Sequence, residues 1–471
     1  MLDIAFGDQH AAVERLPAEL LGETFMLVCA GEVDPHERLL ATLKLLQVCR
    51  SWRHIARHTP RLFTSLTVTS FARYANHLPV TADWIARSSP HLLHFVFDVA
   101  ELEGWNAAAV HHCLQLVAPR LGQLTIGTSA ALYAALARMR VAFLRLTHLL
   151  VFIVNEDSWS GPPAELSPLL PRLRTLELAA PVHLAHFRFP WAQLTSLVLR
   201  GDVDHTEYDD PYVVTGVLAQ CAALERAELV LRPFLESEVS AGAPAIHLNH
   251  LSYLSLIFDD ELQAGGDASP APLLSRLHLP ALRHLILGWN LARATLIPPT
   301  LSFLARNGAT IESIELMNTP LETRELDSIL ARTPSLRSLT LMWVMVLDYA
   351  GVVWDVLKWD AERRRVPKLR DLAIYVQAGG RWPYEEDDLA MERMIRSRWW
   401  SDAEDAMPHE QCRLRSLTLE LSGSERNVSR EVVARLDTLV DQGLDLHLEH
   451  STHSWFLSGP APSPNADGEH G

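Results

Sequence analysis

Histidine is the residue type in this chain best suited to metal binding or proton transfer near neutral pH, and the sequence holds 22 of them. His447, His450 and His453 recur at a spacing of three, without a cysteine or acidic partner at the spacing of a metal site. The acidic run 207–210 could attract a cation, although a solvated loop explains it more simply. These patterns predict surface histidines rather than ligands.

Motifs for covalent or phosphate chemistry are also missing. The sequence contains no GxSxG, HExxH or GxxxxGK[ST] pattern. Its five cysteines lie far apart with no CxxC pair, which predicts buried apolar side chains rather than a disulfide framework or a metal site: Cys29, Cys49, Cys113, Cys221 and Cys412. We therefore expect no catalytic residues, no cofactor and no metal, and a chain that is not itself an enzyme.

The charge balance limits the kinds of partner. A formal charge of −16 disfavours nucleic acid, because phosphate binding needs a basic surface that releases counterions. The longest apolar run, 341–347, is too short to cross a bilayer, and residues 1–13 lack the basic start and apolar centre of a signal peptide. We expect no membrane partner and a cytoplasmic and/or nuclear protein, with residues 1–13 forming a tail.

A six-residue phrase organises most of the chain. LRSLTL occurs at both 336–341 and 414–419, and its variants start mostly 21 to 33 residues apart. The first residues of the other copies are Leu92, Leu121, Leu146, Leu173, Leu194, Leu224, Leu251, Leu282, Ile311, Leu369 and Leu444.

The spacing inside this phrase predicts a strand that follows a turn. The last two leucines are two residues apart and face one side of a strand, while helix-like stretches separate successive copies. One strand and one helix per repeat predict an α/β leucine-rich-repeat solenoid over 92–456, right-handed, with a parallel β-sheet on its concave face. An ordinary α/β domain is the alternative, but it does not explain a recurring phrase.

Two segments depart from this pattern. The interval from Leu369 to Leu414 contains an insertion at 378–412, for which we expect a helix packed on the solenoid, a regulatory lid being the alternative. Residues 457–471 have the composition of a disordered tail.

Residues 14–66 do not carry the phrase and predict an all-α module, joined to the solenoid by a linker at 67–91. We expect two or three helices, over 17–28 and 38–58, with Pro17 in the first helical turn, where its missing N–H costs no hydrogen bond. The two helices carry more apolar surface than about fifty residues can cover, which predicts a docking surface.

The order and spacing of residues in this module resemble the F-box. The stretch LPAELLGETF is followed by LLQVCRSWRHIARHTPRLF, and an F-box followed by degenerate leucine-rich repeats is similar to a large group of fungal proteins. The resemblance implies that the module binds a Skp-type adaptor and, through it, the cullin of an SCF ubiquitin ligase. The matched pattern implies nine contact or supporting core residues, with Phe63 where the family commonly has Trp: Leu16, Pro17, Leu20, Leu21, Val48, Cys49, Trp52, Ile55 and Phe63.

Basic residues support an acidic partner for the same module. Six occur between Arg38 and Arg61 with no acidic residue among them, in a chain that is acidic overall. A solvated helix face is an equally good explanation of this run.

The repeats also predict a second surface. The seventh position of successive phrases, on the solvent side of the sheet, forms an apolar row of Ile257, Gly288, Met317, Met342 and Tyr375, with Ile286 nearby. The second position places Arg337, Arg370 and Arg415 beside it, preceded by Arg283 and interrupted by Glu312. The row could contact a protein substrate, or be covered by the insertion or the tail, and arginine could simply be habitual at this position.

Together these patterns predict the substrate-recognition subunit of an SCF-type ubiquitin ligase. Its F-box would bind the adaptor, and its repeats would hold a protein substrate that the sequence does not identify. The alternative is a non-catalytic scaffold that uses the same two parts without a cullin.

Overall fold

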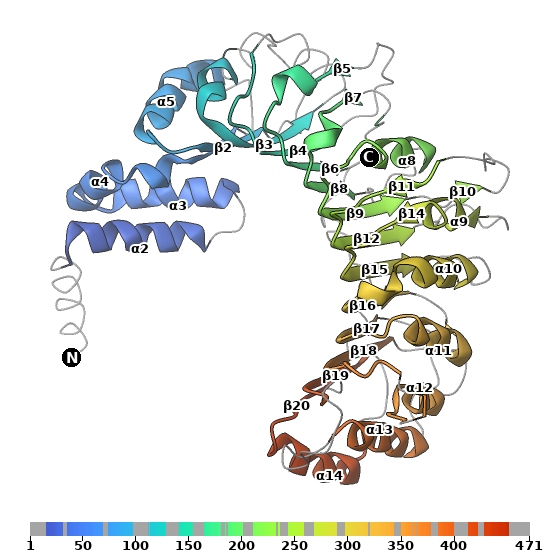
Figure 1. Cartoon of the computed structure of the whole chain (residues 1–471). Coiled ribbons are helices and arrows are strands. Elements are labelled where there is room, and N and C mark those ends of the chain that lie inside the picture. Colours follow the sequence, from blue (N-terminus) through green and yellow to red (C-terminus); the bar gives the residue numbers. More distant parts are fainter. Residues whose placement is uncertain are drawn as a thin grey trace, which may run out of the picture. The chain divides into compact units, whose positions relative to one another are not determined.

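The structure is a computed structural model of the 471-residue chain, and it forms two compact units, 1–230 and 231–471 (Figure 1). The predicted tails 1–13 and 457–471 and most of the insertion 378–412 lie outside the described residues. The described residues are 16–31, 35–68, 74–97, 112, 114–128, 141–153, 164–179, 184, 187–200, 211–231, 234–235, 244–258, 268–289, 297–318, 321–342, 350–360, 362–363, 365–377, 385–399, 413–422 and 428–451.

The first described helices are α2 (Ala18–Ala30), α3 (Pro35–Val48) and α4 (Arg50–Arg57), followed by the 3-10 turn η1 (Pro60–Phe63). Pro17 lies just before α2, with φ −54° and ψ 145°, and its carbonyl accepts a hydrogen bond from the Leu21 N–H at 3.1 Å. The predicted start at Pro17 is therefore one residue early. Proline supplies the first carbonyl of this helix without occupying a helical turn.

The predicted helical stretch 38–58 is divided at Cys49 into α3 and α4, which gives three helices in all before η1 among the described residues. Cys49 adopts an extended conformation, with φ −155° and ψ 175°, and its Sγ accepts the Trp52 N–H at 3.4 Å. Cys49 thus caps α4, and Arg53 braces the corner by donating from Nε to the Leu46 carbonyl at 2.7 Å.

Parallel strands follow in the first unit, each paired with the next. Their order is β1 (Ser65–Val68), β2 (Leu93–Phe97), β3 (Leu121–Thr128), β4 (His148–Ile153), β6 (Thr175–Ala179), β8 (Ser196–Arg200) and β9 (Arg226–Leu231). Alternate residues such as Leu176 and Leu178 are buried, because only one side of each strand faces the core. The parallel sheet is consistent with the predicted repeat solenoid.

Residues 67–91 are not a plain linker. They include the end of β1 and the helix α5 (Tyr74–Arg87), and β1 pairs in parallel with β2. The stretch 63–68 reads Phe-x-x-Leu-x-Val, a copy of the repeat phrase in which the first and last leucines are replaced. The periodicity therefore begins about thirty residues earlier than predicted.

The second unit repeats the pattern with longer helices. Its parallel strands are β12 (Tyr253–Phe258), β15 (His284–Trp289), β16 (Ser313–Met317), β17 (Ser338–Met342), β18 (Asp371–Gln377), β19 (Ser416–Ser422) and β20 (Asp445–Ser451). The helices on one side of them, visible in Figure 1, are α10 (Ile297–Asn307), α11 (Thr323–Ala331), α12 (Ala350–Leu357), α13 (Glu385–Ser397) and α14 (Arg430–Val440). We call the opposite side of these strands the open face.

The repeat pattern predicts a helix between every pair of successive strands, but some of the described connections contain none. Between β4 and β8 the described connections are 3-10 turns and two-residue strands, in segments where Pro168, Pro171 and Pro190 disfavour a helix interior. The remaining short elements are η2 (Ala118–Arg120), β5 (Ala164–Glu165), η3 (Ser167–Leu169), β7 (Phe187–Arg188), η5 (Trp191–Gln193), α8 (Pro211–Leu218), β10 (Phe234–Leu235), β11 (Ile246–His247), β13 (Ala268–Ser269), α9 (Ala271–Leu274), β14 (Leu277–His278) and η8 (Gly308–Thr310).

The insertion supplies helix α13, which is anchored at both ends. Asp388, in its first turn, accepts the backbone N–H of Ser429, just before α14, at 2.8 Å. Arg398, directly after the helix, is fully buried and donates to the carbonyls of Leu357 at 2.6 Å and Val366 at 3.2 Å. Burial lowers the pKa of the Arg398 guanidinium to about 10. These contacts make α13 part of the framework behind the strands.

Candidate protein-binding surfaces

One side of α2 exposes a set of leucines. Leu20 and Leu27 are two helical turns apart and share one side of α2, and Leu16 lies just before the helix. Their exposed fractions are 42% for Leu16, 54% for Leu20 and 74% for Leu27. We call Leu16, Leu20 and Leu27 the leucine face. Side chains of this size are costly to leave in water.

The structure separates the nine residues implied by the F-box resemblance into three groups. Leu21 and Phe63 are buried, and Trp52 and Ile55 are half-buried. The exposed group is Leu16, Pro17, Leu20, Val48 and Cys49. Three further residues of these helices are exposed: Leu43, which belongs to the apolar surface predicted for the second helix, and Leu27 and Val28, which the sequence pattern did not indicate. The spacing of seven between Leu20 and Leu27 is a signal that could have identified Leu27.

Phe63 belongs to the core rather than to a contact surface. Its ring meets Trp84 of α5 edge-on, with centroids 4.8 Å apart at an interplanar angle of 71°. Trp84 in turn donates from Nε1 to the Ser65 carbonyl of β1 at 3.2 Å. Phe63 and Trp84 together thus connect η1, α5 and the first strand.

Some of the six basic residues between Arg38 and Arg61 make contacts within the helical module itself. Arg38 donates to the Cys29 carbonyl at 3.2 Å, and Arg61 pairs with Glu23 at 3.6 Å. Arg53 holds the corner at Leu46, as described above. Lys44, Arg50 and Arg57 are exposed. About half of the run therefore stabilises the helices themselves, and the rest could attract an acidic partner.

The strand register of the second unit places the predicted apolar residues in one row across the open face. Ile257 pairs with Gly288, Gly288 with Met317, Met317 with Met342, and Met342 with Tyr375. We call these five residues the apolar row. Gly288 leaves no gap, because the Ile257 side chain leans over it: a Cβ added there would lie 3.1 Å from Ile257 Cγ1. Ile286 lies in the neighbouring row, beside Glu315.

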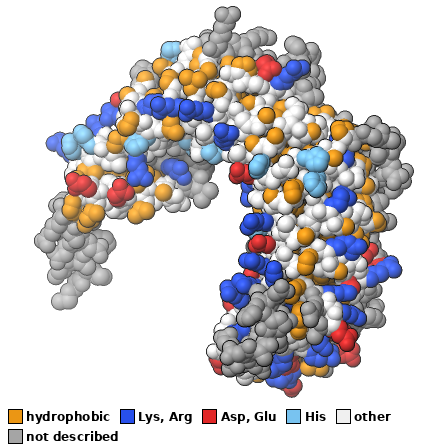
Figure 2. Space-filling model, in the orientation of Figure 1, with side chains coloured by type: hydrophobic (Ala, Val, Ile, Leu, Met, Phe, Trp, Pro, Cys, Tyr) orange, Lys and Arg blue, Asp and Glu red, His pale blue; other side chains and the backbone are white. Residues whose placement is uncertain are grey.

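The arginines that precede these strands are also adjacent. The backbone N–H of Arg370 donates to the Arg337 carbonyl at 2.8 Å, and that of Arg415 to the Arg370 carbonyl at 2.6 Å. Glu312 lies 3.8 Å from Arg283 and 3.7 Å from Arg337, so it shares its charge between two guanidinium groups. Figure 2 shows basic side chains gathered along the strand side of this unit. We call Arg337, Arg370 and Arg415 the arginine row.

The sheet of the first unit carries balanced charge instead. Arg200 of β8 pairs with Glu177 of β6 at 3.0 Å, and Arg226 of β9 pairs with Glu228 on its own strand. A carboxylate next to Arg200 and another next to Arg226 leave these two groups little net attraction for an anionic partner.

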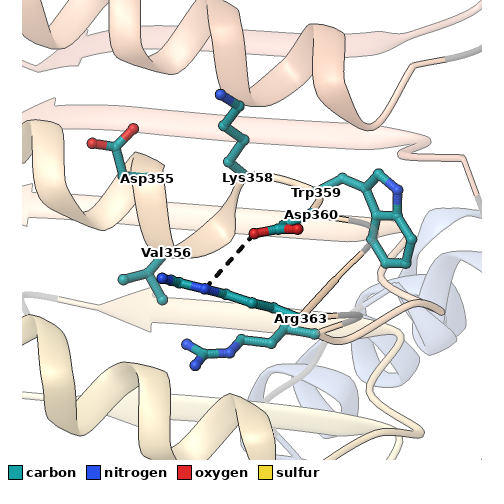
Figure 3. A pocket seen from close by; sticks show the side chains of 7 residues that line it. Asp355, Val356, Lys358, Trp359, Asp360 and Arg363 are labelled. Atoms are coloured by element: carbon teal, nitrogen blue, oxygen red, sulfur yellow. Dashed lines mark ion pairs between the residues drawn. The ribbon is translucent and has the colours of Figure 1, made fainter.

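A shallow cavity of about 310 Å³ lies on the helix side of the second unit, at the end of α12 (Figure 3). Both of its arginines are in ion pairs: Arg363 lies 3.7 Å from Asp360, and Arg365 pairs with Asp327 of α11. The lining residues are Asp355, Val356, Lys358, Trp359, Asp360, Arg363 and Arg365. With acids and bases in similar number, the cavity favours neither a cation nor an anion.

Among the residues that the structure describes, no three His, Cys, Asp or Glu side chains are gathered as metal ligands would be. In the same residues, no helix has both the length and the apolar character to cross a membrane.

Comparison with known proteins adds little. The sequence matches no known protein family and no curated protein. Among solved structures the chain is similar to one described as the crystal structure of the Rad7 and Elc1 complex in yeast, with 14% sequence identity, a TM-score of 0.32, and coverage of 86% of this chain and 96% of that one. At a TM-score this low, conclusions about function depend on the surfaces of this chain alone.

Proposed function

We propose that this chain is the substrate-recognition subunit of an SCF-type ubiquitin ligase. Helices α2 to α4 form an F-box that binds a Skp-type adaptor and, through it, a cullin, and the leucine-rich repeats hold a protein substrate. The observation that carries this proposal is the leucine face, which stays exposed above a helical core already filled by Leu21 and Phe25.

The apolar surface is large enough to matter energetically. Fully burying a leucine contributes about 1.5–3 kcal/mol. Three leucines therefore supply several kcal/mol toward the cost of ordering two proteins at an interface. The exposed Val48 and Leu43 of α3 add further apolar area on the same helices.

In this role the chain supplies no reacting group. It raises the local concentration of a substrate next to the ubiquitin-transferring subunits, so its effect on rate is one of proximity. This proposal agrees with the lack of nucleophile and phosphate-binding motifs in the sequence.

The test measures binding of a purified Skp-type adaptor to the full chain by titration calorimetry. We expect the double variant L20D/L27D to lose at least about 100-fold in affinity, because two carboxylates would have to be buried without partners. Leu144→Asp is the matched control, since Leu144 is 59% exposed in the same unit but outside the leucine face. Equal affinity of the double variant and the control would contradict the proposal.

A second arm separates a ligase subunit from a scaffold. The adaptor-bound chain is mixed with cullin and passed over a sizing column. Elution of the three proteins together is expected for an SCF receptor. Elution of cullin apart from an intact chain–adaptor complex would favour the scaffold instead.

A further inference from the structure

Three neighbouring strands of the second unit, β17, β18 and β19, each begin after an arginine at the second position of the repeat phrase. Strands β17 and β18 begin after Arg337 and Arg370 and carry Met342 and Tyr375 at the seventh position of the repeat phrase. Strand β19 begins after Arg415, which is exposed and makes no ion pair with any residue that the structure describes, and it carries Glu420 at the seventh position, beside Tyr375.

The positions between the two rows carry small side chains. Thr340, Ala373 and Thr418 are register partners at the fifth position. At the third position Ser416 donates from Oγ to Asp371 Oδ1 at 2.9 Å, which engages the one acidic group there. The surface therefore has a low, mostly uncharged floor between a basic end and an end where Met342 and Tyr375 are followed by Glu420.

Acidic residues flank this surface on both sides. On β16 they are Glu315 and, just before the strand, Glu312, and on β20 they are Asp445 and Glu449. An anionic ligand would be repelled from both flanking strands and attracted only to the arginine row. In a chain with a net charge of −16, that row is a local exception.

The dimensions match a short extended peptide. The second and seventh positions of one phrase are five residues apart, about 17 Å at the rise of a β-strand. An extended segment of five or six residues spans that distance. Neighbouring strands lie about 4.8 Å apart, so the long side chains of adjacent arginines can converge on a cluster of charged groups at one end of the ligand.

We propose that β17 to β19 bind an extended acidic segment of a protein. Two or three of its anionic groups pair with the arginine row, and an apolar side chain at its other end packs on Met342 and Tyr375. The anionic groups are carboxylates or phosphates, which guanidinium groups bind alike. The proposal rests on the proposed function only where it takes this segment to be part of the substrate.

The experiment uses the full chain and fluorescein-labelled ten-residue peptides, with binding followed by anisotropy. One probe has three glutamates at one end, a Ser-Gly spacer and Leu-Phe at the other end, and a second reverses this order because either chain direction would fit. A third carries phosphoserine in place of glutamate, which distinguishes phosphate from carboxylate. Two matched probes replace the glutamates by glutamine or Leu-Phe by Ser-Ser.

We expect at least one acidic probe to bind, and its glutamine or Ser-Ser counterpart to bind about tenfold more weakly. In the protein, R337E/R415E should lower affinity for the acidic probe by about tenfold or more, and the loss should shrink at high salt. The triple change of Met317, Met342 and Tyr375 to Ser should weaken the same probe. The control R172E/R393E makes the same change in net charge at two exposed arginines outside the row and should leave affinity within twofold.

Three results would overturn the proposal. The first is that no acidic probe binds, and the second is that R337E/R415E and R172E/R393E bind it equally while their melting temperatures match the parent. The third is binding only after residues 457–471 are removed, because the occupant would then be the chain's own tail. Adaptor binding is measured on the same samples. If the unchanged chain binds the adaptor but none of the acidic probes, this inference is rejected and the proposed function is not.

Discussion

The leucine face and the apolar row are both apolar surfaces, yet they are built in different ways. Leu27 is 74% exposed, because the helix holds it away from its neighbours. Met317, Met342 and Tyr375 are only half-buried, because side chains on adjacent strands shield one another. Exposed fraction alone would therefore select the helix and overlook the sheet. The sheet surface stands out only when its apolar row is considered together with the arginine row.

The largest effect should separate the leucine face from the core beneath it. Phe63→Ala should lower the free energy of unfolding by about 3–5 kcal/mol, because it removes a buried ring that packs on Trp84. Leu20→Ala should change it by less than about 0.5 kcal/mol. Urea denaturation of both variants checks this, and similar losses would mean that Leu20 belongs to the core.

A smaller effect should distinguish the two surfaces. Met342→Ala should lower the free energy of unfolding by about 1 kcal/mol, because Met342 lies beside side chains of the adjacent strands in the folded chain. Leu27→Ala should leave the free energy of unfolding almost unchanged. The same denaturation experiment measures both variants, and an equal cost would remove the contrast between helix and sheet.

The next prediction concerns the corner between α3 and α4. Cys49→Ser should raise the free energy of unfolding by about 0.5 kcal/mol, because a hydroxyl is a better N-cap than a thiol for the Trp52 N–H. Cys49→Ala should lower it by a similar amount. If thermal unfolding gives the same midpoint for both variants, Cys49 does not act as a cap.

The smallest effect is expected at Glu315 on the open face, where burial raises the pKa above its ordinary value of 4.5. As pH rises through that value, the unfolded chain loses its proton first, so stability falls until the folded group ionises as well. Glu315→Gln should therefore raise stability at pH 7 by less than about 1 kcal/mol and leave it unchanged at pH 4. A gain of equal size at both pH values would point to a cause other than ionisation.

The sequence predicts the strands better than the segments that join them. Every copy of the repeat phrase, from Leu92 to Leu444, corresponds to a strand, because its two inward leucines need a sheet to bury them. The copy at 63–68 was missed because Phe and Val replace its outer leucines. The break at Cys49 was missed because the apolar pattern runs through it, and cysteine is not a typical helix cap.

For the candidate sites, the sequence predicts which residues belong to the helical module and the strands, but not which of their side chains are exposed to solvent. Leu20 and Leu21 are adjacent residues of the same type, yet one is 54% exposed and the other 5%. Only the packing of α2 on its neighbours determines which of them faces water. The two rows of the open face were easier to anticipate, since parallel strands in register bring equal repeat positions side by side.

Phe63 closes the helical segment, and it also stands at the first position of the earliest repeat phrase, so one side chain belongs to two structures. Within the first unit no spacer therefore separates the helices from β1. A partner bound to α2 would therefore be held at a fixed position relative to the first strand. Lengthening the chain between Phe63 and Ser65 would make this connection flexible. The position of the bound partner relative to β1 would then vary, even if every binding residue were kept.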